Sequence, residues 1–151
     1  MIQKLFATLA LTLILVPGNI TPATAQNLDV IKERKDSFQA LLPHAKVGKA
    51  MVQGRSDFDL EKAKGVFQGY AALAKKLPTL FPEDSKEGGK TEALPVIWEK
   101  KDDFKALFAK FEKDAKTAAE SITDAASFRA EWGKVMGNCG TCHKQYRKAK
   151  S

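Results

Sequence analysis

The chain has few of the residues that build metal clusters, disulfide frameworks or strands. Its 151 residues include two cysteines and two histidines. A four-ligand zinc site would need both histidines, yet His44 is remote from the other candidates and lies in no paired-ligand spacing. No segment alternates apolar and polar residues as a half-buried strand does, and there is no internal repeat or low-complexity segment. These absences argue against a zinc site and against β and α/β folds, and they favour an all-α protein.

A concentrated block of positive charge is also missing, although the net charge is +7. Lysine and arginine are interspersed with aspartate and glutamate, as in residues 61–64 and 112–114. This pattern is typical of solvated helix surfaces rather than of a nucleic-acid interface. We therefore expect no nucleic-acid partner.

Long apolar runs are absent after the first 25 residues. Residues 1–25 combine Lys4, an apolar run from Leu9 to Val16 and the small-residue site Ala23-Thr24-Ala25, which is the pattern of a cleaved secretory signal peptide. The run is too short to span a bilayer. We expect a mature chain that begins at Gln26, does not insert into a membrane and resides in the periplasm. Removing 25 of the 151 residues leaves 126, enough for a single domain over 26–151.

Both cysteines belong to one motif, Cys139-Gly140-Thr141-Cys142-His143. Residues three apart lie on one face of a helix, so both thiols can add to the vinyl groups of a porphyrin while the adjacent imidazole ligates the iron. A thioredoxin-like dithiol would follow a strand, and no strand pattern precedes Cys139. The motif predicts one haem c attached through Cys139 and Cys142, with His143 as axial iron ligand. An oxidising compartment outside the cytoplasm suits such an attachment.

The segment around this motif has an uninterrupted helical seam with steps of three and four residues. The seam comprises Ala125, Phe128, Trp132, Val135, Cys139, Cys142 and Tyr146. Thr123-Asp124 offers an N-cap, and Gly133 and Gly137 would allow close approach of the macrocycle or a neighbouring helix. Because the cysteines share the seam with aromatic residues, we expect the haem inside a helical bundle.

Three further segments carry helical periodicity. The first runs from about Leu28 toward Gln53, with a kink expected one turn beyond Phe38 because Pro43 interrupts it. The second begins after Ser56 or Asp57 and stops at Pro78, and the third begins near Val96 with Ile97, Phe104, Phe111 and Ala118 facing inward. Residues 78–95 contain three prolines and a Gly-Gly pair and form a connection. The predicted fold is an antiparallel four-helix bundle with a long loop between helices 2 and 3.

These features together resemble the cytochrome c′ family. The motifs that carry the resemblance are the C-x-x-C-H on the last helix, Tyr146-Arg147 and the lysine-rich end after it, Arg34-x-x-x-Phe38, and Pro95-x-Ile97-Trp98. Class I cytochromes c differ, since they carry the motif near the N-terminus and a ligating methionine far downstream. No methionine follows His143 in this chain.

The resemblance implies a pentacoordinate, high-spin iron with His143 as its proximal ligand. Phe38 matches the position where the family places an apolar residue over the vacant distal face, and where c-556 relatives place a ligating methionine. Phe38 is also explained simply as a core residue of the first helix. Among rival ligands, Met51 lies about 20 Å beyond Phe38 along a helix and His44 is turned about 120° away from it. A surface or helix-contact role is therefore expected for His44.

Three other residues are candidates for the haem site. The resemblance implies that Arg147 covers the imidazole side, and Arg34 is expected to pair with a haem propionate through its guanidinium fork. Both arginines have the ordinary alternative of surface charges. Trp98 is a candidate for packing against the haem, although aromatic residues at helical spacing are more often simply core.

The function implied by the resemblance is binding of NO and CO, together with electron transfer to an unidentified redox partner. An apolar distal residue offers no donor to bound O₂, so O₂ should bind poorly. The alternative is a six-coordinate electron-transfer cytochrome of the c-556 type. We expect no enzymatic role beyond weak peroxidase activity, because efficient O–O cleavage needs a distal acid–base group. The family commonly forms homodimers through its first helices, where Val47 and Met51 are candidate contacts.

Overall fold

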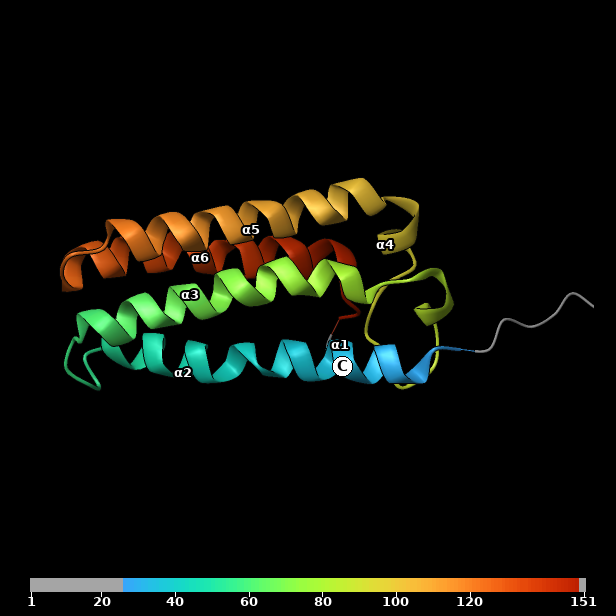
Figure 1. Cartoon of the computed structure of the whole chain (residues 1–151), viewed down its shortest axis with the longest axis horizontal. Coiled ribbons are helices and arrows are strands. Elements are labelled where there is room, and N and C mark those ends of the chain that lie inside the picture. Colours follow the sequence, from blue (N-terminus) through green and yellow to red (C-terminus); the bar gives the residue numbers. More distant parts are fainter. Residues whose placement is uncertain (1–25, 150–151) are drawn as a thin grey trace, which may run out of the picture.

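The protein is a bundle of four helical rods in a computed structural model that describes residues 26–149. The predicted signal peptide at residues 1–25 lies outside the described residues. Figure 1 shows the rods alternating in direction along the chain, which confirms the all-α antiparallel bundle. The rods are formed by α1 (Leu28–Gln39) with α2 (Leu41–Val52), α3 (Leu60–Lys76), α5 (Lys101–Ser121) and α6 (Ala125–Tyr146). Within the described residues there is no strand, and no helix there is long and apolar enough to cross a membrane.

The first rod is interrupted where the proline predicted a kink. Pro43 has no N–H to offer the carbonyl of Gln39, four residues earlier, and the helix is broken at Ala40 between α1 and α2. Ala40 keeps helical dihedrals, with φ −63° and ψ −16°. The break is therefore mild, and α1 and α2 continue as one long rod (Figure 1).

The second helix ends just before Pro78 and the third begins at Val96, as predicted, but the second begins later than predicted and the third is interrupted. The N-cap of α3 is Asp59, which accepts a hydrogen bond of 3.0 Å from the N–H of Lys62, rather than Ser56 or Asp57. After α3 the chain continues as a 3₁₀ turn η1 (Leu77–Leu80), a second turn η2 (Glu83–Ser85) and a short helix α4 (Val96–Glu99). Lys100, with φ −120° and ψ 50°, separates α4 from α5. The predicted third helix is thus in two parts.

The core lies between the rods and follows the predicted periodicity. All four residues expected to face inward from the third helix, Ile97, Phe104, Phe111 and Ala118, are buried. On α6 the seam is buried at Phe128, Val135 and Tyr146, whereas Ala125 is exposed. The N-cap of α6 is Asp124, whose capping box with Ser127 confirms the expected N-cap.

Two glycines set how closely the rods approach one another. A Cβ atom at Gly48 of α2 would overlap the ring of Trp132 on α6, and one at Gly69 of α3 would overlap the ring of His44 on α2. Gly133 and Gly137 face open space, so neither admits a neighbouring helix, and close approach of the macrocycle there stays a prediction. The rods pack closely through α2, not through the glycines of α6.

The apolar surface of the first rod is smaller than expected. Val47 is exposed, with 40% of its surface accessible, but Met51 is buried at 7%. Met51 packs within the core cluster, so the expectation that it forms part of an exposed dimer contact is wrong.

Candidate haem attachment site

The last two turns of α6 carry the three residues of the attachment motif. Cys139 and Cys142 are free thiols and half-buried, and Cys142 packs against the core. His143 follows on the exposed side. The carbonyl of Tyr146 at the end of the helix accepts a hydrogen bond of 3.0 Å from the N–H of Leu94. Both ends of α6 are therefore held, by this bond and by the Asp124 cap.

Burial keeps both thiols protonated at neutral pH. It raises the pKa of Cys142 to about 11, with a further contribution from the neighbouring Cys139, and it also raises the pKa of Cys139. Each thiol can add across one vinyl double bond of a porphyrin, its sulfur bonding to one vinyl carbon and its hydrogen to the other. Among the described residues, no group of three or more His, Cys, Asp or Glu side chains could hold a metal ion. The donor set fits porphyrin attachment.

The contact between Gly48 and Trp132 fixes which residues lie opposite His143. Helix α6 runs antiparallel to the first rod (Figure 1), and His143 lies eleven residues, about three turns or 16 Å, beyond Trp132. Eleven residues back from Gly48 along the first rod is Ser37, next to Phe38. Eleven residues also turn a helix by only about 20° beyond three full turns. His143 therefore lies at the level of Phe38 along the bundle, with its side chain exposed.

Aromatic contacts lead to the same alignment. The ring centroid of Phe38 lies 6.4 Å from that of Phe108, and Phe108 lies 5.1 Å from Phe104. Phe104 in turn lies 5.1 Å from Tyr146, which is three residues after His143. Phe38 and the end of α6 thus share one cross-section of the bundle, and the side chains between them are apolar.

Arg34 is buried, with 3% of its surface exposed, and its guanidinium is engaged by the loop after α3. Four of its N–H groups donate to the Leu80 carbonyl at 3.2 Å, the Ser85 hydroxyl at 3.2 Å, the Ser85 carbonyl at 3.1 Å and the Thr91 hydroxyl at 2.9 Å. It is not a surface charge. Pairing with a propionate stays a prediction, and it would use the remaining Nε–H or replace one of these bonds.

Trp98 belongs to the same cluster as Arg34. The Arg34 guanidinium lies 4.5 Å from the ring centroid of Phe81 and 5.9 Å from that of Trp98. The indole N–H of Trp98 donates to the Pro82 carbonyl at 3.0 Å. Trp98 therefore helps to hold the loop that accepts the hydrogen bonds of Arg34. Direct packing of Trp98 against a haem stays a prediction.

Arg147 lies just beyond the end of α6 in extended conformation. Its N–H donates to the His143 carbonyl at 3.3 Å, and its Nε–H donates to Glu92 at 2.6 Å. The chain around Arg147 forms an isolated antiparallel bridge with Ala93. The backbone of Arg147 is thus bonded to that of His143, while its side chain is paired with Glu92, a contact that no local sequence pattern indicates.

Tyr70 is buried on α3, as the periodicity of the second helix predicts, and it lies near Cys139, which no local pattern indicates. Its ring is 5.8 Å from that of His44 and 6.2 Å from that of Trp132, which confirms His44 as a helix-contact residue. The hydroxyl is buried without a hydrogen-bond partner. Burial, and then the proximity of Cys139, raise the pKa of Tyr70 above its ordinary value.

These surroundings fit a haem. Besides the two thiols on one apolar stripe, the buried cation of Arg34 has no carboxylate within ion-pair distance among the described residues, and a haem would bring two carboxylates. The buried Tyr70 hydroxyl also lacks a partner. A surface hollow of about 390 Å³ lies elsewhere, between α3 and α5.

Comparison with known proteins supports this interpretation. The family model described as Cytochrome C′ matches residues 29–147. Cytochrome c′ of Rhodopseudomonas palustris is 44% identical over 129 residues, covering 85% of this chain and 88% of that protein. A cytochrome c-556 of Agrobacterium tumefaciens is 39% identical over 100 residues, covering 65% of this chain and 78% of the relative.

Solved structures of relatives have the same architecture. The Rhodopseudomonas palustris cytochrome c′ structure matches with a TM-score of 0.79 over 82% of this chain and 98% of that one. The structure of a mutant cytochrome c prime from Alcaligenes xylosoxidans, solved as its nitric oxide complex, matches with a TM-score of 0.72 at 25% identity, over 83% of this chain and 98% of that one.

Proposed function

Because the chain belongs to the cytochrome c′ family, we propose that it is a periplasmic haem c protein whose iron has His143 as its one protein ligand and binds NO and CO. Cys139 and Cys142 would hold the haem covalently. The haem iron supplies reversible binding of diatomic ligands and one-electron exchange. The observation that carries the proposal is the position of Phe38, level with His143 across the bundle and unable to ligate iron.

The chemistry of Phe38 determines which ligands the site favours. Its half-buried ring packs on Phe108 and offers no hydrogen-bond donor. Bound O₂ carries partial negative charge that needs such a donor, whereas NO and CO depend on it less. A ligand on this side must displace the ring, and the more strongly bonding NO tolerates that cost better than CO. The nitric oxide complex of the Alcaligenes xylosoxidans relative lends support by analogy.

The arginines argue against an enzymatic role. A peroxidase needs a distal acid–base group and a free cationic side chain at the iron. Arg34 donates four of its N–H groups to protein acceptors, and Phe38 has no titratable group. Arg147 would act on the imidazole side, and only when its pair with Glu92 opens. Peroxidase activity should therefore be weak.

The alternative is a six-coordinate electron-transfer protein like cytochrome c-556, and the similarity to the Agrobacterium relative favours it. That alternative needs a sixth ligand at the level of His143. Since the His44 ring is held between Gly69 and Tyr70, it is a poor candidate. In either case the protein would exchange electrons with a redox partner.

Self-association through the first rod is part of the proposal. Three large apolar side chains are exposed on the rod, namely Leu28, Leu42 and Val47. Sedimentation of the haem-loaded protein should then give a dimer, and a monomer at high protein concentration would reject this part.

Optical and EPR spectra of the mature holoprotein test the proposal directly. A high-spin ferric and ferrous haem that shifts on addition of NO or CO is expected. The Phe38→Met variant should become low-spin by gaining a thioether ligand, while a Phe38→Leu control stays high-spin and binds CO faster. A wild-type spectrum that is low-spin and unresponsive to NO would instead favour the c-556 type.

A further inference from the structure

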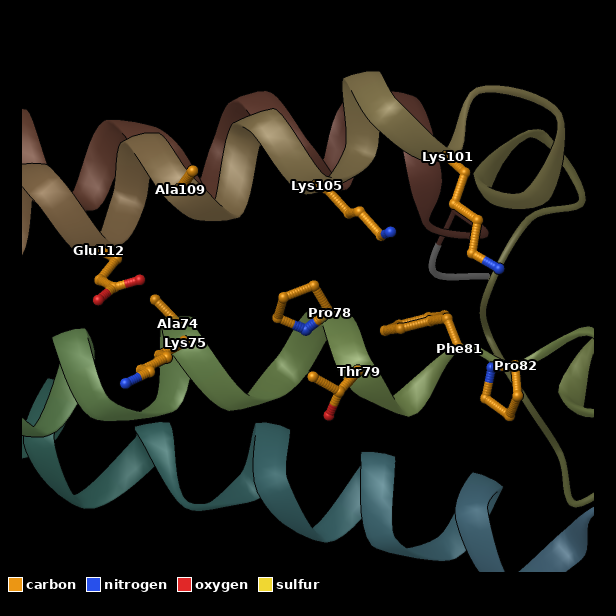
Figure 2. A pocket seen from close by; sticks show the side chains of 10 residues that line it. All are labelled: Ala74, Lys75, Pro78, Thr79, Phe81, Pro82, Lys101, Lys105, Ala109 and Glu112. Carbon is orange, nitrogen blue, oxygen red and sulfur yellow. The ribbon is translucent and has the colours of Figure 1, made fainter.

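A hollow of about 390 Å³ lies between α3 and α5, where η1 follows α3 (Figure 2). Its floor is apolar and includes Pro78 and Phe81. Three lysines line it: Lys101 and Lys105 extend from α5, and Lys75 comes from α3 (Figure 2). We call this feature the α3–α5 groove. It combines an apolar floor with positive charge, the composition of a surface that receives an acidic protein.

The positive charge of the groove is only partly balanced by the protein itself. Among the described residues, neither Lys75 nor Lys105 has a carboxylate within ion-pair distance. Lys101 lies 3.5 Å from Glu83, but Glu83 is also 2.7 Å from Lys86. At the other end of the groove, Glu112 is paired with Lys116 at 2.6 Å. An incoming carboxylate would therefore meet one unpaired ammonium group in the middle, on Lys105, and another at the Glu112 end, on Lys75 (Figure 2).

The floor of the groove is linked by ring contacts to the haem attachment helix. Phe81 is buried, and its ring centroid lies 4.7 Å from that of Phe104. Phe104 lies 5.1 Å from Tyr146, three residues after His143. Trp98 packs on Phe81 at 5.9 Å and so keeps the floor in place. Packed rings thus connect the groove with the end of α6, without a solvent gap.

We propose that the α3–α5 groove is the docking surface for an acidic one-electron transfer protein. Carboxylates of the partner would approach the three lysines, and its apolar contact would rest on Pro78 and Phe81. One electron passes between the partner and the haem iron, which changes between Fe³⁺ and Fe²⁺ while the partner changes by one electron, and no bond is made or broken. The inference rests only on the redox part of the proposed function.

Stopped-flow reduction of the ferric holoprotein by reduced plant-type [2Fe–2S] ferredoxin, an acidic one-electron donor, tests the docking surface. At low salt, the variant Lys75→Glu with Lys105→Glu should react about tenfold more slowly, within the range of electrostatic steering. A control with Lys49→Glu and Lys113→Glu changes the net charge equally, on exposed helix positions outside the groove, and should slow the reaction no more than about twofold. The difference should shrink in about 0.5 M salt because screening shortens electrostatic reach.

A third variant separates the groove from net charge alone. Ala109 lines the groove and is exposed, so Ala109→Trp fills the groove without altering charge. It should slow the reaction severalfold at both low and high salt. Equal slowing by the two charge variants, or an Ala109→Trp protein that reacts at full rate, would overturn the assignment. NO-difference spectra of every variant should match wild type. If the haem does not bind NO, the proposed gas binding is rejected, but the reduction rates of the variants still test the docking surface.

Discussion

Replacing Arg34 with methionine should lower the free energy of unfolding by about 2–4 kcal/mol. The change leaves the buried carbonyls of Leu80 and Ser85 without a donor, at about 1–2 kcal/mol each. It also removes the cation above Phe81, a contribution of about 1–2 kcal/mol. Part of this loss is offset, because burial opposes the charged form and lowers the pKa of Arg34. The Ser85 hydroxyl is less affected, since it donates to the Pro82 carbonyl at 2.9 Å.

Urea unfolding of the holoprotein, followed by far-UV circular dichroism, measures this loss. The Arg34→Lys variant keeps the charge but not the fork that reaches four acceptors, so it should recover less than half of the loss. A Thr91→Val control removes one acceptor of Arg34, which also accepts from the N–H of Ala93 at 3.2 Å, and it should cost less than Arg34→Met, about 1–2 kcal/mol. If Arg34→Met destabilises by under about 1 kcal/mol, the hydrogen bonds of Arg34 do not hold the loop as argued.

Three further changes probe the packing and the caps. Gly48→Ala should lower the free energy of unfolding by about 1–3 kcal/mol because its Cβ would overlap Trp132. Gly65→Ala on α3 faces open space and should raise the free energy of unfolding by up to about 1 kcal/mol through helix propensity. Thermal unfolding compares the two variants, and equal shifts in Tm would contradict the close contact at Gly48. Tyr70→Phe should stabilise the haem-free chain by about 1 kcal/mol in urea unfolding, since the removed hydroxyl is buried without a partner; a clear loss would mean that the hydroxyl is bonded. A first-turn N–H of α6 donates to Asp124 and lowers its pKa, so the pKa of Asp124 is lower in the folded than in the unfolded chain. The stabilisation from this carboxylate is complete above about pH 4 and is lost as the pH falls through the folded pKa. Asp124→Asn keeps the cap and should flatten the dependence of Tm on pH between about pH 2 and 5; an unchanged slope would assign the acid sensitivity to other carboxylates.

The attachment helix was predictable because its signals are local. The spacing of Cys139, Cys142 and His143, the three-and-four seam and the Asp124 cap all depend on residues within a few turns of one another. Pro43 likewise acts on the carbonyl four residues before it, so the break near Phe38 could be located. Periodicity also identified the buried face of the third helix.

The errors arose where distant residues meet. Local propensity could not identify Gly48 as the residue that accommodates Trp132. The engagement of Arg34 and the pairing of Arg147 with Glu92 join residues more than 45 positions apart. Such contacts depend on how the loop after α3 folds back, and no short pattern records that path.

That loop connects the two helices on which the proposed site depends. Thr91 accepts a hydrogen bond from Arg34 of α1 through its hydroxyl at 2.9 Å, and its carbonyl accepts one from the Lys148 ammonium, just beyond α6, at 3.1 Å. The Lys148 N–H also donates to the Glu92 carbonyl at 2.8 Å. Phe38 lies one turn after Arg34, and His143 lies about one turn before Lys148. In the proposed site, the separation of Phe38 from His143 would therefore depend on a loop that carries none of the haem-attachment residues.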